Sequence, residues 1–186
     1  MHTTKDHDLY IVRYTGPFGF IKPWTAVRDG ETYSQPFLTP SIVEGMRQKL
    51  EVEQILRHRL RYAGVSEQQE QTQPRDWQKQ RPSSILVRGV LLQPTLWLAF
   101  ATNQEAEQAA SQHLCLCRNE DLVYPQSPPR QITEQEFDKI EGVELRFGDG
   151  SGSFCVGYNR YDNQAMFGSL QIVGNPVVSE QEDITL

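Results

Sequence analysis

The feature that most constrains the fold is the apolar stretch of residues 84–101, SILVRGVLLQPTLWLAFA. Both halves are rich in large apolar and β-branched residues, and Pro94 separates them because proline cannot donate a hydrogen bond inside a sheet. We therefore predict two strands, joined by a turn or a bulge at Pro94, that pass through the core. No continuous apolar run in the chain approaches the roughly 18 residues that a membrane span requires.

Length and composition indicate one domain in a reducing compartment. The chain has 186 residues, with 23% charged and 38% hydrophobic residues, which is enough to bury a core. Its N-terminus, MHTTKDHD, carries acids where a secretory signal would be apolar, and three cysteines do not form a disulfide framework. We predict a cytoplasmic protein in which residues 1–178 form a single domain and residues 179–186 form a flexible acidic tail.

The negative net charge of the chain, −6, is unevenly distributed. Residues 1–63 hold nine basic and seven acidic residues, whereas residues 64–186 hold nine and seventeen. A locally basic face can bind phosphate although the whole protein is acidic. The N-terminal third is therefore a candidate for contact with nucleic acid, and an ordinary solvated basic strand is the alternative.

A second informative stretch, residues 14–50, combines a turn, a loop and a helix start. The predicted strand 9–14 breaks at a turn that contains Gly16, Pro17 and Gly19. Cations and aromatic residues interleave in the exposed loop that follows. These loop residues are Lys22, Trp24, Arg28 and Tyr33.

The helix of this stretch is predicted to begin at Thr39 or Ser41, either of which can act as the N-cap. Pro40 suits the first helical position, and Ser41 and Glu44 have the spacing of a capping box. Apolar residues recur at helical spacing as far as Leu50, so one face should pack against a sheet. Free backbone amides can make such a helix start a phosphate-binding site. An ordinary capped helix without a ligand is the alternative.

Residues 54–62, QILRHRLRY, alternate in a way that favours a strand. Alternation would place Arg57, Arg59 and Arg61 together on one face. One long helix over residues 44–60 is the competing interpretation, because no glycine or proline break separates the two segments after Gly45.

Residues 66–82, SEQQEQTQPRDWQKQRP, contain almost nothing to bury and are predicted to form a long exposed loop or hairpin tip. A tryptophan among cations can stack on a base while its neighbours hold phosphates, and a surface loop without a ligand is the alternative. The residues concerned are Arg75, Trp77, Lys79 and Arg81.

The second half of the chain gives further predicted elements. They are a short helix at 103–111, a rigid connector at 125–129 (PQSPP), a capped helix at 133–140, a hairpin of 143–147 with 153–161, and a last strand at 166–173. The loop at 148–152, GDGSG, lacks the Lys and Ser/Thr of a phosphate-binding P-loop, so a hairpin turn explains it as well.

No signature of a catalytic or metal centre stands out. His113, Cys115 and Cys117 alternate on one expected strand face, and a metal site with Cys155 is conceivable, but buried free thiols are the favoured interpretation. The four histidines are scattered along the chain. We therefore predict no metal and no cofactor.

The strand, turn, basic loop and helix of residues 14–50 resemble the N-terminal part of CRISPR-associated RAMP-type proteins of the fifth Cas family. In that family a glycine turn leads through an F-x-x-P-like segment, here Phe20–Pro23, to a helix that opens with T-P-S or P-P-S and carries a glycine, here Thr39–Ser41 and Gly45. Three later segments are similar in order and hydrophobic pattern. They are QILRHRLRY (54–62), SSILVRGVLLQPTLWLAFAT (83–102) and SFCVGYNRYDNQAMFGSLQIVGNPVV (153–178).

The resemblance implies an α+β fold with a ferredoxin-like (RRM-like) antiparallel sheet, one main helix, an extended hairpin or thumb loop at 66–82, and extra C-terminal strands. It also implies a subunit of a Cascade-type complex that holds the 5′ handle of the crRNA. Its partners would be the crRNA, the repeated backbone subunit and the large subunit, with target DNA close by and no membrane.

One branch of this family cuts pre-crRNA with a tyrosine before T-P-S and a Lys-His pair after the third strand. Tyr33 lies near the first place, two residues further upstream than the family pattern, and the second place reads QEAEQAAS (104–111), without Lys or His. Cleavage through a 2′-hydroxyl needs such a base and cation. We therefore predict that the chain binds processed RNA and is not an enzyme.

Two alternatives stay open: a metal-independent endoribonuclease that uses Tyr33 with His58 or His113, and a protein-interaction module that binds no RNA. The RNA-binding hypothesis predicts that replacing Arg57, Arg59 and Arg61 together by alanine weakens RNA binding and leaves the fold intact. The predicted RNA-binding residues are Lys22, Trp24, Arg28, Tyr33, Ser41, Arg47, Arg57, Arg59, Arg61, Arg75, Trp77, Lys79 and Arg81.

Overall fold

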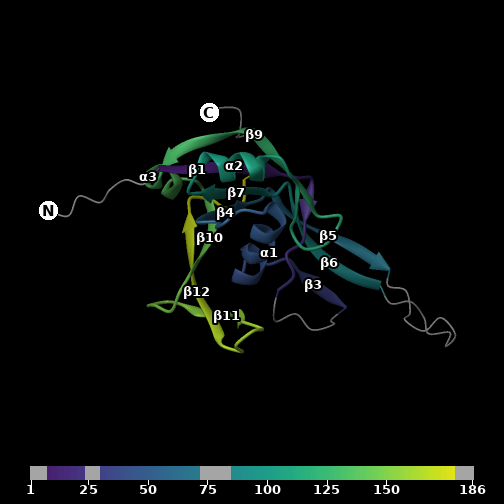
Figure 1. The fold of residues 1–186 in the computed structure, drawn as a ribbon. Helices are drawn as coiled ribbons and strands as arrows, with labels where there is room; N and C mark the ends of the chain where they lie inside the picture. The colour runs from purple at the N-terminus through teal and green to yellow at the C-terminus, as the bar shows by residue number, and fades with distance from the viewer. Residues whose placement is uncertain (1–7, 24–29, 72–84, 179–186) are drawn as a thin grey trace.

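The computed structural model describes residues 8–23, 30–71 and 85–178, which form a mixed α+β fold in which antiparallel strands predominate (Figure 1). No helix among these residues is long and apolar enough to cross a membrane. In chain order the elements are β1 (Asp8–Thr15), β2 (Phe18–Gly19), β3 (Glu31–Tyr33), α1 (Pro40–Leu50), β4 (Arg57–Arg61), β5 (Gly64–Gln71), β6 (Ile85–Leu92), β7 (Thr95–Phe100), α2 (Asn103–Ala110), β8 (Leu114–Cys115), β9 (Leu122–Thr133), α3 (Glu134–Asp138), β10 (Gly142–Phe147), β11 (Phe154–Tyr158) and β12 (Ala165–Val173).

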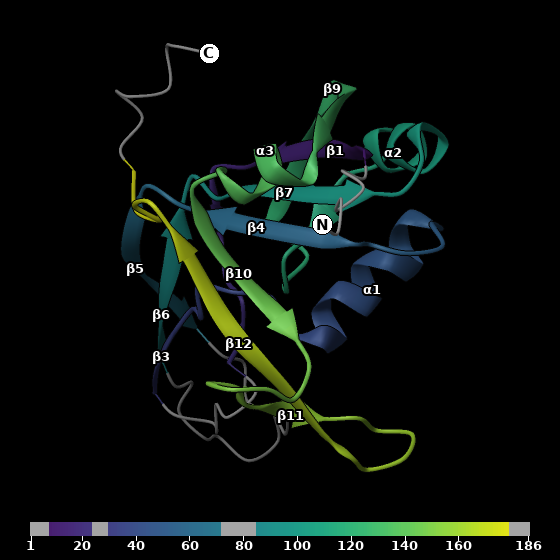
Figure 2. The same cartoon turned by 90° about the vertical axis from the view of Figure 1, so that its left-hand side faces the viewer.

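The main sheet has eight strands in the order β11-β12-β10-β4-β7-β1-β9-β8. At its centre β4, β7, β1 and β9 pair side by side, and all three pairings are antiparallel. β10, β12 and β11 extend this sheet beyond β4, as Figure 2 shows. The central strands and the two longer helices follow one another along the chain as β1, α1, β4, β7, α2 and β9, with the strands of the second sheet and β8 inserted between them.

The second sheet is smaller and is built around β6, which pairs with β2, β3 and β5. β5 and β6 form a long antiparallel hairpin whose register runs from Gly64–Leu92 to Gln71–Ile85. Residues 66–71 of the predicted thumb loop therefore lie in a strand, because each pairs with β6, and residues 72–82 lie outside the described residues.

α1 and α2 cover one face of the central strands. Alternate strand residues such as Tyr14 and Leu98 are fully buried there, together with Leu50 of α1 and Ala109 of α2. The Tyr14 hydroxyl donates a 2.6 Å hydrogen bond to the carbonyl oxygen of Ala109, which ties β1 to α2. On the opposite face, α3 covers only one part, where Phe137 packs against a small apolar cluster.

The strand pair predicted for residues 84–101 is confirmed. β6 ends at Leu92, β7 begins at Thr95, and the two are joined at Gln93 and Pro94. The strand at Arg57–Arg61 is confirmed as well. The alternative of one helix over 44–60 is wrong, because α1 ends at Leu50 and Glu51 adopts a left-handed conformation with φ of 57°.

The predicted helix starts are confirmed in part. Thr39 is the N-cap of α1 and Pro40 is its first residue, but the capping box is absent because the Glu44 carboxylate accepts hydrogen bonds from Arg47 and Gln48 instead. The hydrogen bond from Arg47 lowers the pKa of Glu44 to about 2. A capping box does form at α3, between Thr133 and Glu136.

Three predictions for the second half of the chain are wrong. Residues 125–129 belong to β9, and their prolines are tolerated because the register with β1 shifts there. β10 and β11 do not pair with each other, because β12 lies between them and pairs with both. Cys115 and Cys117 are exposed rather than buried, because Leu114 and Leu116 fill the adjoining core.

His58 of β4 makes the stability of the fold dependent on pH. The residue is 3% exposed, and burial lowers its pKa from 6.5 to about 4, with smaller effects from Glu144, Arg59 and Arg57. The unfolded chain therefore takes up a proton near pH 6.5, whereas the folded chain does so only near pH 4. The contribution of His58 to the free energy of unfolding is therefore complete above about pH 6.5 and is lost as the pH falls toward 4.

We expect the free energy of unfolding to drop by about 2 kcal/mol between pH 7 and pH 5 through this group alone. Urea denaturation at both pH values measures this drop. His58→Gln keeps an acceptor for the Leu145 amide, which donates to His58 Nε2 at 3.4 Å, and should reduce the pH dependence. An unchanged pH dependence in this variant would assign the effect to other groups.

Candidate nucleic-acid interface

The open face of the central sheet, opposite α1 and α2, carries two rows of polar and aromatic side chains. Residues aligned across antiparallel strands project from the same face, and alternate residues project from the other. The helix-covered face takes Val12, Tyr14, Leu96 and Leu98. Strand pairing aligns the polar and aromatic side chains of the open face in two rows, Arg13–Trp97–Arg59 and Thr15–Thr95–Arg61, next to a third row, Ile11–Ala99–Arg57.

Trp97 is flanked by two guanidinium groups. The Cζ atom of Arg13 lies 5.7 Å from the centroid of the Trp97 ring, and that of Arg61 lies 5.2 Å from it. A guanidinium over an indole is attracted by the negative charge of the ring face. The tryptophan therefore brings together two cations from the strands on either side of β7.

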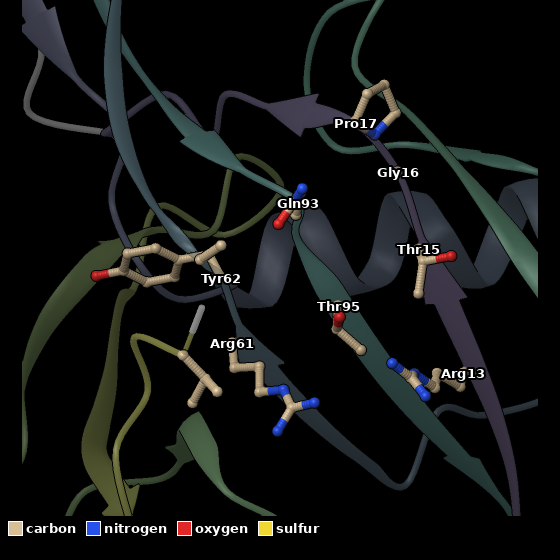
Figure 3. Close-up of a pocket in the computed structure, with 10 residues that line it drawn as sticks. Arg13, Thr15, Gly16, Pro17, Arg61, Tyr62, Gln93 and Thr95 are labelled. Carbon is tan, nitrogen blue, oxygen red and sulfur yellow. The ribbon is translucent and has the colours of Figure 1, made fainter. Parts of the chain in front are cut away.

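A cavity of about 450 Å³ opens beside these two arginines. Figure 3 shows Arg13 and Arg61 projecting from β1 and β4 on either side of Thr95. Among the described residues that line the cavity, two are arginines and none is acidic, in a chain of net charge −6. The lining residues are Arg13, Thr15, Gly16, Pro17, Arg61, Tyr62, Ala63, Gln93, Thr95 and Val178.

Two connections, at Gly16–Pro17 and at Gln93–Pro94, lie beside each other at the upper end of this cavity (Figure 3). The Gly16 amide donates to the carbonyl oxygen of Pro94 at 3.3 Å, and the Gln93 amide donates to that of Pro17 at 2.9 Å. A Cβ atom on Gly16 would collide with the carbonyl oxygen of Leu122 in β9. A glycine is therefore required at position 16, because the backbone of β9 passes close to it at the edge of the cavity.

The three arginines of β4 do share one face, but the structure corrects the expectation that all three are open to RNA. Arg57 donates to Glu144 and to Asp138, with Nη2–oxygen distances of 2.8 Å for each. Arg59 is fully buried and donates to Glu144 at 3.1 Å and to the Ile140 carbonyl oxygen at 3.0 Å. Arg61 alone of the three lines the cavity.

Burial on its own raises the pKa of Glu144, but the hydrogen bonds and positive charges of Arg57 and Arg59 have the larger combined effect, and the pKa ends below its ordinary value. The carboxylate is therefore ionised at neutral pH. It compensates two cations that the sheet packs against Phe137, whose ring centre is 4.7 Å from the Cζ atom of Arg57. The triple alanine variant is thus expected to disturb the fold.

The other described candidates lie elsewhere. Lys22 is exposed in the segment after β2. Arg47 pairs with Glu44 and donates to the Val52 carbonyl oxygen at 2.9 Å, so it closes the end of α1. Ser41 lines a second cavity, of about 620 Å³, between the start of α1 and the end of β11 with the turn that follows it, which contribute Tyr158 and Tyr161.

The side chain of Tyr33 makes contacts that hold the smaller sheet together. Its ring packs on Gly89 of β6 so closely that a Cβ atom there would overlap it, and its hydroxyl donates to Glu67 of β5. Hydrogen bonds to Glu67 and Glu31 raise its pKa. Tyr33 therefore joins β3 to the β5–β6 hairpin. The remaining candidates, Trp24, Arg28, Arg75, Trp77, Lys79 and Arg81, lie outside the described residues.

The structure does not bring together the groups of the alternative ribonuclease centre. Tyr33 belongs to the smaller sheet and His58 is buried in the main one, where its ring contacts Phe147. His113 packs beside Tyr124, with ring centres 6.0 Å apart. Within the described ranges, no group of three or more His, Cys, Asp or Glu side chains could hold a metal ion.

Sequence reasoning missed Arg13 and Trp97, although both fall in predicted strands. The alternation in LYIVRYT and TLWLAF places them opposite the buried residues, and this signal could have identified them. Their convergence with Arg61 depends on which strands are neighbours.

Comparisons with known proteins give distant likenesses among solved structures. No protein-family model matches the sequence, and no curated protein matches it. Among solved structures, a chain of a "CRISPR RNA-guided surveillance complex" aligns with 91% of this chain and with 90% of its own length, at 11% sequence identity and a TM-score of 0.49.

Proposed function

We propose that this protein is a non-catalytic, crRNA-binding subunit of a type I, Cascade-like CRISPR effector complex, and that it caps the 5′ handle. The observation that carries the proposal is the arrangement of Arg13, Trp97 and Arg61 beside a cavity whose lining, among the described residues, contains no acidic side chain. Proteins hold single-stranded RNA with cations that contact phosphates and with flat groups on which bases stack. On this sheet the guanidinium groups of Arg13 and Arg61 supply the cations, and the guanidinium and indole planes supply the flat groups.

The order of the elements supports the ferredoxin-like core that the sequence resemblance implies. Numbering β1, β4, β7 and β9 as strands 1 to 4 gives the chain order β-α-β-β-α-β and the pairing order 4-1-3-2. RNA-recognition domains with such sheets stack bases on the open face. Arg13 and Trp97 lie on the two middle strands of that face.

Binding without cleavage is supported by the surroundings of Tyr33 and His58, two residues of the alternative ribonuclease centre. The burial of His58 keeps it from contact with a bound strand, and the hydroxyl of Tyr33 is engaged by Glu67. A separate nuclease would then produce the crRNA.

Protein partners have a candidate surface on the extension of the main sheet formed by β10, β11 and β12. Strand pairing places four partly exposed apolar side chains on one face, with exposed fractions between 38% and 63%. Contiguous exposed apolar residues mark interaction sites. These residues, Phe147, Phe154, Leu170 and Ile172, would meet the backbone subunit or the large subunit.

The test is to express the chain together with the products of its neighbouring genes, purify it through a tag and sequence the RNA that survives nuclease treatment. Uniform small RNAs with one shared 5′ end are expected. Recovery of the chain without RNA, or with RNA of random ends, would overturn the proposal and favour a protein-interaction module. Cleavage of repeat RNA by the chain alone would favour the ribonuclease.

A further inference from the structure

The cavity beside Arg13 and Arg61 has features that a general RNA-binding surface does not need. It is about 450 Å³, which falls within the range of roughly 300–1,000 Å³ that is typical of small-molecule sites. Its lining includes two cations, Arg13 and Arg61, and three residues with hydroxyl or amide groups, Thr15, Thr95 and Gln93. Figure 3 shows these side chains around one space, and they come from β1, β4, β7 and the connection between β6 and β7.

Gln93 is the unusual residue in this lining. Its φ is 47°, in the left-handed region that residues other than glycine, asparagine and aspartate rarely adopt. Among the residues that the structure describes, none hydrogen-bonds the side-chain amide of Gln93, although its backbone amide is held by Pro17. Backbone strain of this kind persists where the surroundings fix it, and it is frequent at ligand-binding positions.

We propose that this cavity receives a single unstacked nucleotide of the bound RNA, and that the Gln93 amide hydrogen-bonds the edge of its base. This inference rests on the proposed function and adds the position at which one base is read. The guanidinium groups of Arg13 and Arg61 each contact one of the two phosphates that flank that nucleotide, and the hydroxyl groups of Thr15 and Thr95 contact its sugar or base. A side-chain amide, which has both donors and an acceptor, suits the edge of an unpaired base.

The test scans the co-purified RNA with single abasic positions and measures the affinity of the full chain, or of the complex in which it purifies. One abasic position is expected to weaken binding about tenfold, while its neighbours have smaller effects. Gln93→Gly removes the amide and suits the positive φ, so it leaves the fold intact. It should weaken binding to intact RNA about fivefold and have no further effect on RNA that is abasic at that position.

Gln108→Ala is the matched control, because Gln108 is exposed on α2 over the covered face of the sheet. RNA binding without coupling between Gln93 and any base position would overturn the nucleotide pocket and leave the proposed function standing. A wild-type chain that binds no RNA would overturn both. Equal binding of a free mononucleotide and of the oligonucleotide would show a free-nucleotide site, and would also overturn the pocket as a reader of bound RNA.

Discussion

Replacing Glu144 by alanine is expected to lower the free energy of unfolding by about 3–5 kcal/mol, a large fraction of the stability of a single domain. Glu144 is 2% exposed and accepts hydrogen bonds from both Arg57 and Arg59. Arg59 is itself fully buried, so removal of the carboxylate leaves its positive charge without compensation inside the protein. Urea denaturation of the full chain measures the loss.

Two further variants separate the charge of Glu144 from its packing. Glu144→Gln keeps the shape of the side chain and one acceptor oxygen. Its free energy of unfolding should therefore be higher than that of the alanine variant but clearly lower than that of the wild type. Glu120→Ala removes a surface partner that lies 3.4 Å from Arg118 and should cost less than about 1 kcal/mol. A Glu144→Ala variant as stable as the Glu120→Ala variant would show that Arg57 and Arg59 find other partners.

The elements that follow from local signals were predicted well. Alternation and Pro94 define the strand pair β6–β7, and the helical spacing after Pro40 defines α1. Alternation also identifies the arginine-bearing face of β4. Each of these signals lies within a few residues of the element that it specifies, so a single sequence contains it.

The functional meaning of the arginines could not be predicted in the same way. Arg57 and Glu144 are 87 positions apart, and only the pairing of β10 beside β4 brings them together. Local spacing cannot distinguish a cation that will be compensated in the interior from one that will face solvent. The same holds for Trp97, which meets Arg13 and Arg61 because β7 lies between β1 and β4.

Replacing Arg13 and Arg61 together by alanine is expected to weaken RNA binding by at least about 100-fold at low salt, because two charge-assisted contacts of about 1.5–3 kcal/mol each are lost. The slope of the logarithm of affinity against the logarithm of salt concentration should become shallower by about 1.4, since two phosphate contacts are lost from a single strand. Fluorescence anisotropy with the co-purified RNA at several salt concentrations measures both effects.

The matched control is the pair Lys49→Ala and Lys139→Ala, which removes the same charge from exposed positions on α1 and after α3. If the overall charge of the chain attracted RNA, both double variants would lose affinity equally, and the open sheet face would not be the site. Arg13→Lys with Arg61→Lys adds a second distinction. It should keep the salt dependence and still lose affinity, because a lysine is a point charge that cannot offer a flat guanidinium to a base. Loss in the alanine pair, partial loss in the lysine pair and none in the control would together assign RNA contact to the two cations that Trp97 holds.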